Sequence, residues 1–148
     1  MTKSGDKVMQ TRLNPYINFN GNTREAMEFY KTIFGGKLEM STFGDMPMSD
    51  MDESENNKIM HSMLEAENGI VFMAADMPNH MEYKEGSNFS MSLSGDDEEE
   101  LRSYWDKLGE GGTIYQPLEK APWGDSFGML VDKFGVRWLM NITGTKAE

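Results

Sequence analysis

The hydrophobic and polar positions along this chain of 148 residues repeat one arrangement twice. In residues 13–21, Ile17 and Phe19 alternate with asparagines and the run ends at Gly21, a pattern typical of a half-buried strand. Residues 89–95 follow the same rule, with apolar residues alternating with serines before a glycine. The pattern therefore predicts two strands, each with one apolar and one polar face.

A helical pattern follows each predicted strand. The first helix is predicted to begin at Asn22, with Glu25 three residues later in the arrangement of a capping box. The second is predicted to begin near Asp96 or Asp97, with acids in its first turn where the helix dipole favours them. Apolar residues recur at helical spacing in both: Ala26, Phe29, Tyr30, Ile33 and Phe34, then Leu101, Tyr104, Trp105 and Leu108.

Glycine pairs, a further strand and a hairpin complete each half. Gly35–Gly36 and Gly111–Gly112 follow the two helices, where glycine supplies the left-handed C-terminal cap. Asn68–Gly69 is a strong two-residue turn signal for the first hairpin. The sequence pattern predicts strands at 37–43, 58–66 and 70–76 in the first half and at 113–117, 126–132 and 136–142 in the second.

The order strand, helix, strand, strand, strand thus occurs twice, with matching glycines, and indicates an internal duplication. We predict an α+β fold in which residues 1–148 form a single domain of two tandem βαβββ modules. The modules span about 13–76 and about 88–143. Residues 45–57 are acidic and predict a loop, either a solvated insertion or a lid over a pocket.

Composition and charge narrow the classes of partner. The net charge is −11, which disfavours nucleic acid as a partner but could attract cationic small molecules. The absence of cysteine excludes disulfides, thiolate metal sites and a cysteine nucleophile. No apolar run approaches the roughly 20 residues of a membrane span, and the N-terminus has no signal-peptide core, so we predict a soluble cytoplasmic protein. Fifteen methionines suit irregular cores or adaptable apolar pockets.

Several motifs in order resemble the PhnB-like branch of the vicinal oxygen chelate superfamily, which includes glyoxalase I, bleomycin-resistance proteins and extradiol dioxygenases. They are PYINFNGNTREAMEFYKTIFGG, FGDMP, MHSMLEAENG, PWGDSFG and VDKFGVRWLMN, spread over residues 14–142. The resemblance implies the glyoxalase/bleomycin-resistance-like fold, in which the two βαβββ modules form a curled mixed sheet. Each module then forms half a cup, with the helices on its outer face. It also implies a homodimer. Members often carry a demethylubiquinone methyltransferase label, but the sequence shows no glycine-rich strand-to-helix loop for a nucleotide-type cofactor, so no cofactor is expected.

Metal-dependent members of the superfamily take four inward-facing His and Glu ligands from the first and last strand of each module. Carried onto this sequence, those positions are Tyr16, Met73 (or Ala75), Ser90 and Leu139. Zinc and divalent transition metals prefer imidazole, carboxylate or thiolate ligands, and none of these residues supplies one. We therefore predict no metal at the superfamily position.

A stripe of polar residues is predicted to face the cup. Buried polar side chains need partners, so the stripe indicates either a wet, ligand-accepting cup or side chains that bond one another around water. Arg137 would suit an anionic group of a ligand, or is an exposed cation at a strand end. The residues are Tyr16, Asn18, Asn20, Ser90, Ser92, Arg137 and Asn141.

His61 and Asp76 are the weak catalytic candidates. A two-residue turn at Asn68–Gly69 would pair His61 with Asp76 across the first hairpin. Such a pair can orient an imidazole as a base and raise its pKa, or it can simply tie down the end of the hairpin. The parity of the strand leaves open whether His61 points into the cup or away from it.

The loop before the last hairpin carries Trp123, Asp125 and Phe127 between glycines. Aromatic residues on a loop over a cup suit the wall of an apolar ligand site. They would equally suit a hydrophobic plug or a dimer contact.

Three functions follow from these observations. The first is a metal-independent small-molecule-binding protein of unknown ligand, with an apolar cup and a polar floor, and whether it turns over its ligand stays open. The second is bleomycin-resistance-like sequestration of a cationic drug, which the net charge of −11 fits. The third is a glyoxalase- or dioxygenase-type metalloenzyme with a relocated metal site, for instance at His61 and Asp76.

Overall fold

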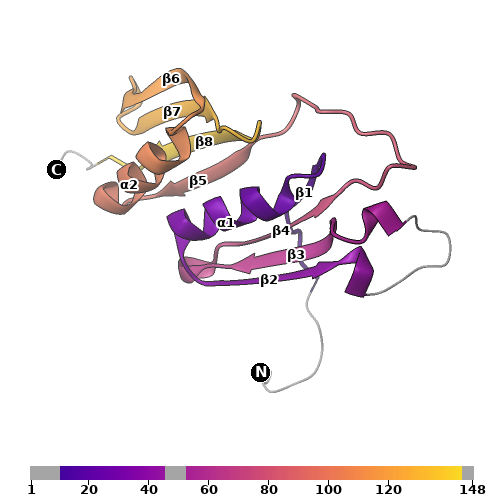
Figure 1. Cartoon of the computed structure of the whole chain (residues 1–148). Helices are drawn as coiled ribbons and strands as arrows, with labels where there is room; N and C mark the ends of the chain where they lie inside the picture. Colours follow the sequence, from indigo (N-terminus) through magenta and orange to yellow (C-terminus); the bar gives the residue numbers. More distant parts are fainter. Residues whose placement is uncertain (1–10, 46–52, 145–148) are drawn as a thin grey trace.

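The structure is a computed structural model that describes residues 11–45 and 53–144. It has the predicted α+β fold, and the order strand, helix, strand, strand, strand occurs twice (Figure 1). Residues 46–52, most of the predicted loop or lid, lie outside the described residues. The first half contains β1 (Tyr16–Phe19), α1 (Thr23–Phe34), β2 (Lys37–Thr42), β3 (Ile59–Glu65) and β4 (Val71–Asp76). The second contains β5 (Met91–Gly95), α2 (Glu98–Gly109), β6 (Thr113–Lys120), β7 (Ser126–Val131) and β8 (Arg137–Ile142).

Each half folds into a four-stranded mixed sheet. The first sheet has the order β1-β4-β3-β2 and the second has the corresponding order β5-β8-β7-β6. In each sheet the first strand pairs in parallel with the last strand of its module, and the other pairs are antiparallel. The strands β1 and β5 are therefore edge strands of their sheets. No helix among the described residues is both long and apolar enough to cross a membrane.

The two helices begin with different caps. In α2 the side chain of Asp97 accepts a hydrogen bond from the backbone N–H of Glu100 at 3.1 Å, as the acidic start of that helix predicts. In α1 the predicted capping box is wrong, because the side chain of Asn22 makes no cap hydrogen bond. The buried carboxylate of Asp76 caps this helix instead, accepting from the backbone N–H of Thr23 at 3.0 Å and from its hydroxyl at 2.7 Å.

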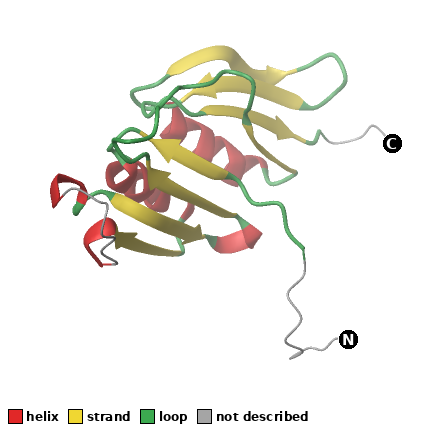
Figure 2. Cartoon of the chain, turned by 90° about the vertical axis from the view of Figure 1, so that its right-hand side faces the viewer, coloured by secondary structure: helices red, strands yellow, loops and turns green. Residues whose placement is uncertain are grey.

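Both helices share one hydrophobic core with both sheets. The ring of Phe34 in α1 contacts Phe72 of β4, Trp138 of β8 and Tyr104 of α2, with ring centroids 4.8–6.2 Å apart. The rings of Phe72 and Trp138 also meet, at 6.3 Å. In Figure 1, α1 lies between β5 and the strands of the first sheet, and Figure 2 shows the two α-helices between the strands of the two sheets.

The helices cover one face of each sheet, as the resemblance implied, and they lie between the two sheets. The opposite faces of the two sheets are therefore turned away from each other within one chain. We call the opposite side of each sheet its open face. Strand alternation and pairing define it: Tyr16, Asn18, His61, Met63 and Met73 on the first sheet, and Ser92, Phe127, Met129, Arg137, Leu139 and Asn141 on the second.

A buried carboxylate joins the two modules. Asp132 accepts hydrogen bonds from the hydroxyl of Tyr30 in α1 at 2.6 Å and from the indole N–H of Trp138 at 2.9 Å. It also accepts from the backbone N–H groups of Phe134 and Val136 in the turn between β7 and β8. Burial and the negative charge of Asp132 raise the pKa of Tyr30 far above its ordinary value, so its hydroxyl stays a neutral donor.

Candidate functional site

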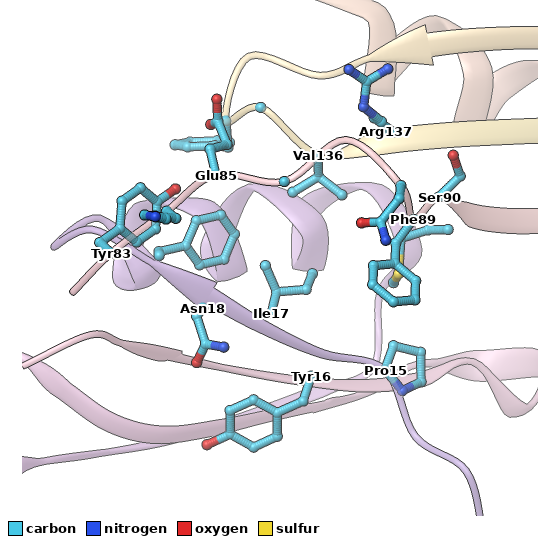
Figure 3. A pocket seen from close by; sticks show the side chains of 17 residues that line it. Pro15, Tyr16, Ile17, Asn18, Tyr83, Glu85, Phe89, Ser90, Val136 and Arg137 are labelled. Atoms are coloured by element: carbon cyan, nitrogen blue, oxygen red, sulfur yellow. The ribbon is translucent and has the colours of Figure 1, made fainter. Parts of the chain in front are cut away.

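A pocket of about 510 Å³ lies where the edge strand β1 meets residues 83–91 and the turn between β7 and β8 (Figure 3). Ile17 and Val136 approach each other across it, and Phe89 closes one end. Its polar lining includes Asn18 and Ser90. The volume falls within the range of about 300–1,000 Å³ that small-molecule sites occupy, and the mixture of apolar wall and few polar groups is typical of them.

Four of the residues predicted to bind a ligand line this pocket: Tyr16, Asn18, Ser90 and Arg137. Tyr16 and Asn18 lie in the edge strand β1, Ser90 directly precedes the edge strand β5, and Arg137 begins the inner strand β8. The structure thus brings together the first strand of the first module and the starts of the first and last strands of the second. Ser90 precedes β5 rather than lying within it as the sequence pattern predicted.

Other lining residues were not anticipated. Ile17 lies in β1 and Val136 directly precedes β8, and both line the pocket. Tyr83 and Glu85 belong to the connection between the modules, and Phe89 precedes β5 although the alternation predicts it as the first residue of that strand. No sequence signal marks these residues as pocket lining, because an irregular connection has the period of neither a strand nor a helix.

Arg137 is the cation of greatest interest in the pocket. Its side chain is half-buried, and within the part of the chain that the structure describes it has neither a hydrogen bond nor an ion pair. The carboxylate of Glu85 packs over the turn instead, since a Cβ atom at Gly135 would lie 2.6 Å from Glu85 Oε2. An unpaired guanidinium in a chain of net charge −11 is suited to bind an anionic ligand group.

His61 lies beside Tyr16 rather than opposite Asp76, which corrects the predicted His–Asp pair. The hairpin loop has three residues, Glu67–Gly69, and pairs Ser62 with Ala74. A shift of one position changes every pairing along a hairpin. The Nδ1 atom of His61 is 3.2 Å from the hydroxyl of Tyr16, so both side chains lie on the open face of the first sheet.

Asp76 has a structural role at the other side of the sheet. Besides capping α1, it accepts a hydrogen bond from the backbone N–H of Ile59 at 2.8 Å. The residue is 4% exposed, and both of its carboxylate oxygens bond to protein groups. Neither oxygen is turned toward His61, so the two catalytic candidates do not form a unit.

The remaining predicted residues lie outside the pocket. Asn20 is exposed just after β1. Trp123 is 62% exposed, and its ring contacts Phe127 at a centroid distance of 5.9 Å. The amide of Asn141 donates to Asp125 Oδ2 at 3.0 Å, and the carboxylate also accepts from the backbone N–H of residue 144. This second group belongs to the open face and adjoining loop of the second sheet, so one chain does not unite it with Tyr16 and Asn18.

The positions that correspond to superfamily metal ligands do not suit a divalent ion. In the register, Tyr16 pairs with Met73, and Leu139 pairs with Ser92 rather than Ser90. Across residues 11–45 and 53–144, no three His, Asp or Glu side chains are grouped so as to hold a metal. The expected absence of such a centre stays a prediction, and the donor set is consistent with it.

Comparisons of the sequence and of the structure with known proteins identify relatives of this chain. A family model described as 3-demethylubiquinone-9 3-methyltransferase matches residues 11–141. Protein YjdN from Escherichia coli (strain K12) is 30% identical over 140 residues, covering 88% of this chain and 94% of that protein. The crystal structure of protein PA1353 from Pseudomonas aeruginosa has a TM-score of 0.82 at 36% identity, covering 92% of this chain and 100% of that chain.

A putative 3-demethylubiquinone-9 3-methyltransferase, PhnB protein, from Bacillus cereus has a TM-score of 0.68 at 25% identity, covering 90% of this chain and 100% of that one. The fold extends further, to a glyoxylase/bleomycin resistance protein/dioxygenase domain from Frankia sp. EAN1pec. That domain has a TM-score of 0.62 at 10% identity, covering 92% of this chain and 99% of its own, and the likeness concerns the fold alone. The chain therefore belongs to the 3-demethylubiquinone-9 3-methyltransferase family, and it shares its fold with the glyoxylase/bleomycin resistance protein/dioxygenase domain.

Proposed function

We propose that the chain is a small-molecule-binding protein that takes an apolar ligand with an anionic group in the pocket beside β1. The observation that carries this proposal is Arg137, a half-buried guanidinium without a partner among the described residues, on a wall that is otherwise largely apolar. Ile17, Phe89 and Val136 would contact the apolar body of the ligand. The binding requires no metal, because the anchoring charge comes from the protein.

The polar groups of the pocket suit orientation of the ligand. Asn18 and Ser90 carry side chains that can donate or accept hydrogen bonds beside the Arg137 anchor. The pocket also contains Lys84 and Glu85, so its lining carries more positive than negative charge despite the acidity of the whole chain. This local balance favours an anion over a cationic drug as its occupant.

The arrangement gives no support to transfer of a methyl group from a nucleotide-type cofactor. Such cofactors use a glycine-rich strand-to-helix junction whose free backbone N–H groups bind phosphate. At the junction between β1 and α1, the backbone N–H of Thr23 is already bonded to Asp76. The family description therefore shows only that the chain is related to these proteins, and we do not assign methyl transfer to it.

Binding of 1-naphthoate, followed by isothermal titration calorimetry, tests the pocket. Arg137→Gln should weaken binding roughly 10-fold or more, because it removes a charge-assisted hydrogen bond of about 1.5–3 kcal/mol. The neutral 1-naphthamide should bind the two proteins equally. Arg24→Gln, at an exposed position of α1 outside the pocket, is the matched control and should bind as the wild type does. An affinity of Arg137→Gln for 1-naphthoate equal to that of the wild type would refute the anionic anchor.

We further propose a homodimer in which the open face of one chain's first sheet packs against the open face of the partner's second sheet. Apolar side chains occupy both faces, among them Met63 and Met73 on the first sheet and Phe127, Met129 and Leu139 on the second. Within one chain the helices between the sheets keep these faces apart. A twofold axis would form two such contacts at once, the self-complementary arrangement common in soluble dimers.

Light scattering during size-exclusion chromatography tests the dimer. The wild type should elute at twice the chain mass, and Met129→Glu should shift it to the monomer because it places a charge in an apolar contact. Met81→Glu, in the exposed connection between the modules, should leave the dimer intact. A monomeric wild type would refute this arrangement.

A further inference from the structure

Two methionines and a histidine gather on the open face of the first sheet. Met63 of β3 and Met73 of β4 are directly paired across the antiparallel ladder. His61 lies two residues before Met63 on the same strand, so its side chain emerges on the same face. All three side chains are partly accessible. We propose that His61, Met63 and Met73 form a binding site for copper(I).

The spacing of the strands allows the three donor atoms to converge. Directly paired residues of antiparallel strands have Cβ atoms about 4.5–5.5 Å apart, which brings the thioethers of Met63 and Met73 within reach of one ion. Two residues along a strand add about 7 Å, and a methionine side chain with three rotatable bonds can cover that distance toward His61. One ion above the ladder could therefore take two sulfur atoms and one imidazole nitrogen.

Tyr16 orients the imidazole of this site. Its hydroxyl lies 3.2 Å from His61 Nδ1. The hydroxyl oxygen can accept the Nδ1 proton in a hydrogen bond. That tautomer leaves the lone pair of Nε2 for an ion. Histidine ligands of metals characteristically donate their other ring nitrogen to such a neighbour, which fixes both tautomer and orientation.

The donor set selects the kind of ion. Thioethers are soft ligands that favour copper(I), whereas zinc and the harder divalent ions favour carboxylates, imidazoles or thiolates in larger number. No grouping of three His, Asp or Glu side chains competes for the ion among the described residues. The ligands are neutral, which suits a monovalent cation better than a divalent one.

The second module provides an internal comparison. Its corresponding pair is Met129 and Leu139, and Phe127 stands where the first module has His61. The second sheet thus retains one of the three donors in the same geometry, so the proposed site belongs to the first module alone. Neither methionine lines the Arg137 pocket, and Tyr16 is the one residue that the two sites share. Both methionines also lie on the face that we propose as a dimer contact. Titration of Arg137→Gln with 1-naphthoate and light scattering of the methionine double variant therefore separate a failure of this site from a failure of those two proposals.

Anaerobic competition with the chromophoric chelator bicinchoninate tests the site, with copper(I) as the probe. The wild type should withdraw about one copper(I) per chain from the chelator. The double variant Met63→Leu/Met73→Leu should bind more than about 100-fold more weakly, because it removes two ligands and so exceeds the 10- to 100-fold effect of outer-shell changes. Tyr16→Phe should bind roughly 10-fold more weakly, since it removes only the orienting group. Met81→Leu, an exposed methionine in the connection, is the matched control and should bind as the wild type does.

Leucine replaces methionine at similar volume, so the double variant should melt near the wild type. If it does not fold, methyl NMR of the wild type with silver(I) as a second soft probe decides the matter. The methyl resonances of Met63 and Met73 should shift at one equivalent, and that of Met81 should not. Unchanged copper(I) affinity in the double variant, or a wild type that takes no copper(I) from the chelator, overturns the proposal.

Discussion

The first and second sheets have the same strand order and the same parallel edge strand, yet they present different chemistry on their open faces. The open face of the first sheet carries an imidazole and two thioethers, groups that can bind protons or soft metal ions. The open face of the second sheet carries aromatic and aliphatic side chains and an amide–carboxylate pair. The corresponding side chains are His61, Met63 and Met73 on the first and Phe127, Met129 and Leu139 on the second. The duplicated scaffold therefore fixes positions, and the individual residues decide what each position can bind.

The buried carboxylates differ in the same way. Asp76 stays within its own module, where it connects the end of β4 to the start of α1 and to Ile59. Asp132 reaches across the modules, because it accepts from Tyr30 of the first module and Trp138 of the second. Asp76 thus connects elements within the first module, whereas Asp132 connects the first module to the second.

Removing Asp132 should have the largest effect on stability. Asp132→Ala leaves the buried Tyr30 hydroxyl and Trp138 indole N–H without their acceptor, and each unsatisfied buried donor costs about 1–3 kcal/mol. We expect the free energy of unfolding in urea to fall by about 4 kcal/mol. Asp106→Ala, at an exposed position of α2, is the control and should change it by less than about 0.5 kcal/mol. A loss equal to that of the control would mean that the contact between modules contributes no stability.

Removing Asp76 should cost less and act more locally. Asp76→Ala leaves the N–H and hydroxyl of Thr23 and the N–H of Ile59 unpaired, and we expect a loss of about 3 kcal/mol. Hydrogen exchange should increase at the start of α1 and in β3 while the second sheet keeps its protection. Hydrogen exchange that rises equally in both sheets would show that Asp76, like Asp132, stabilises both modules.

The hydroxyl of Tyr30 should have a smaller effect that depends on pH. Tyr30→Phe removes one hydrogen bond to a carboxylate and should cost about 1.5–2 kcal/mol at pH 7. The folded pKa of Tyr30 is raised, so its contribution is complete below the unfolded value of about 10 and is lost as the pH rises above that value. Wild-type stability measured in urea between pH 8 and 11 should therefore fall more steeply than that of the variant. Parallel curves would contradict the buried, neutral tyrosine.

The strands and helices could be predicted from the sequence, because apolar residues repeat with a period of two in a strand and 3.6 in a helix. Both periods are local properties of the chain. The same alternation places Trp138 and Met140 in the core, where both are buried. The position of the helices between the sheets does not follow from it. An amphipathic helix reveals that one face is apolar, but not which sheet covers it. Contacts such as Phe34 with Trp138 join residues far apart in the chain, and no local pattern encodes them.

The candidate site was predictable only in part for the same reason. Tyr16, Asn18, Ser90 and Arg137 were found because they lie on regular strands or directly beside one. Glu85 and Phe89 depend on how an irregular connection packs against the β7–β8 turn, which has no sequence period. The unpaired state of Arg137 is likewise a property of the folded chain, since it depends on where the acidic residues lie.

The hairpin of the first module gives the smallest effect, and it concerns the register on which the proposed copper site depends. Asn68 has a φ of 64°, a left-handed conformation that asparagine tolerates better than most residues. Asn68→Ala should cost about 1 kcal/mol, and Asn68→Gly should cost less because glycine has no Cβ penalty there. If the loop instead had only two residues, Met63 would no longer pair with Met73. Thermal unfolding of the two variants tests the left-handed conformation, which alanine as stable as glycine at position 68 would contradict. A two-residue Asn–Gly turn would also need this conformation, so the register is read from the nuclear Overhauser contact between the Cα protons of Met63 and Met73. Absence of that contact would contradict the three-residue loop and with it the alignment of the two thioethers.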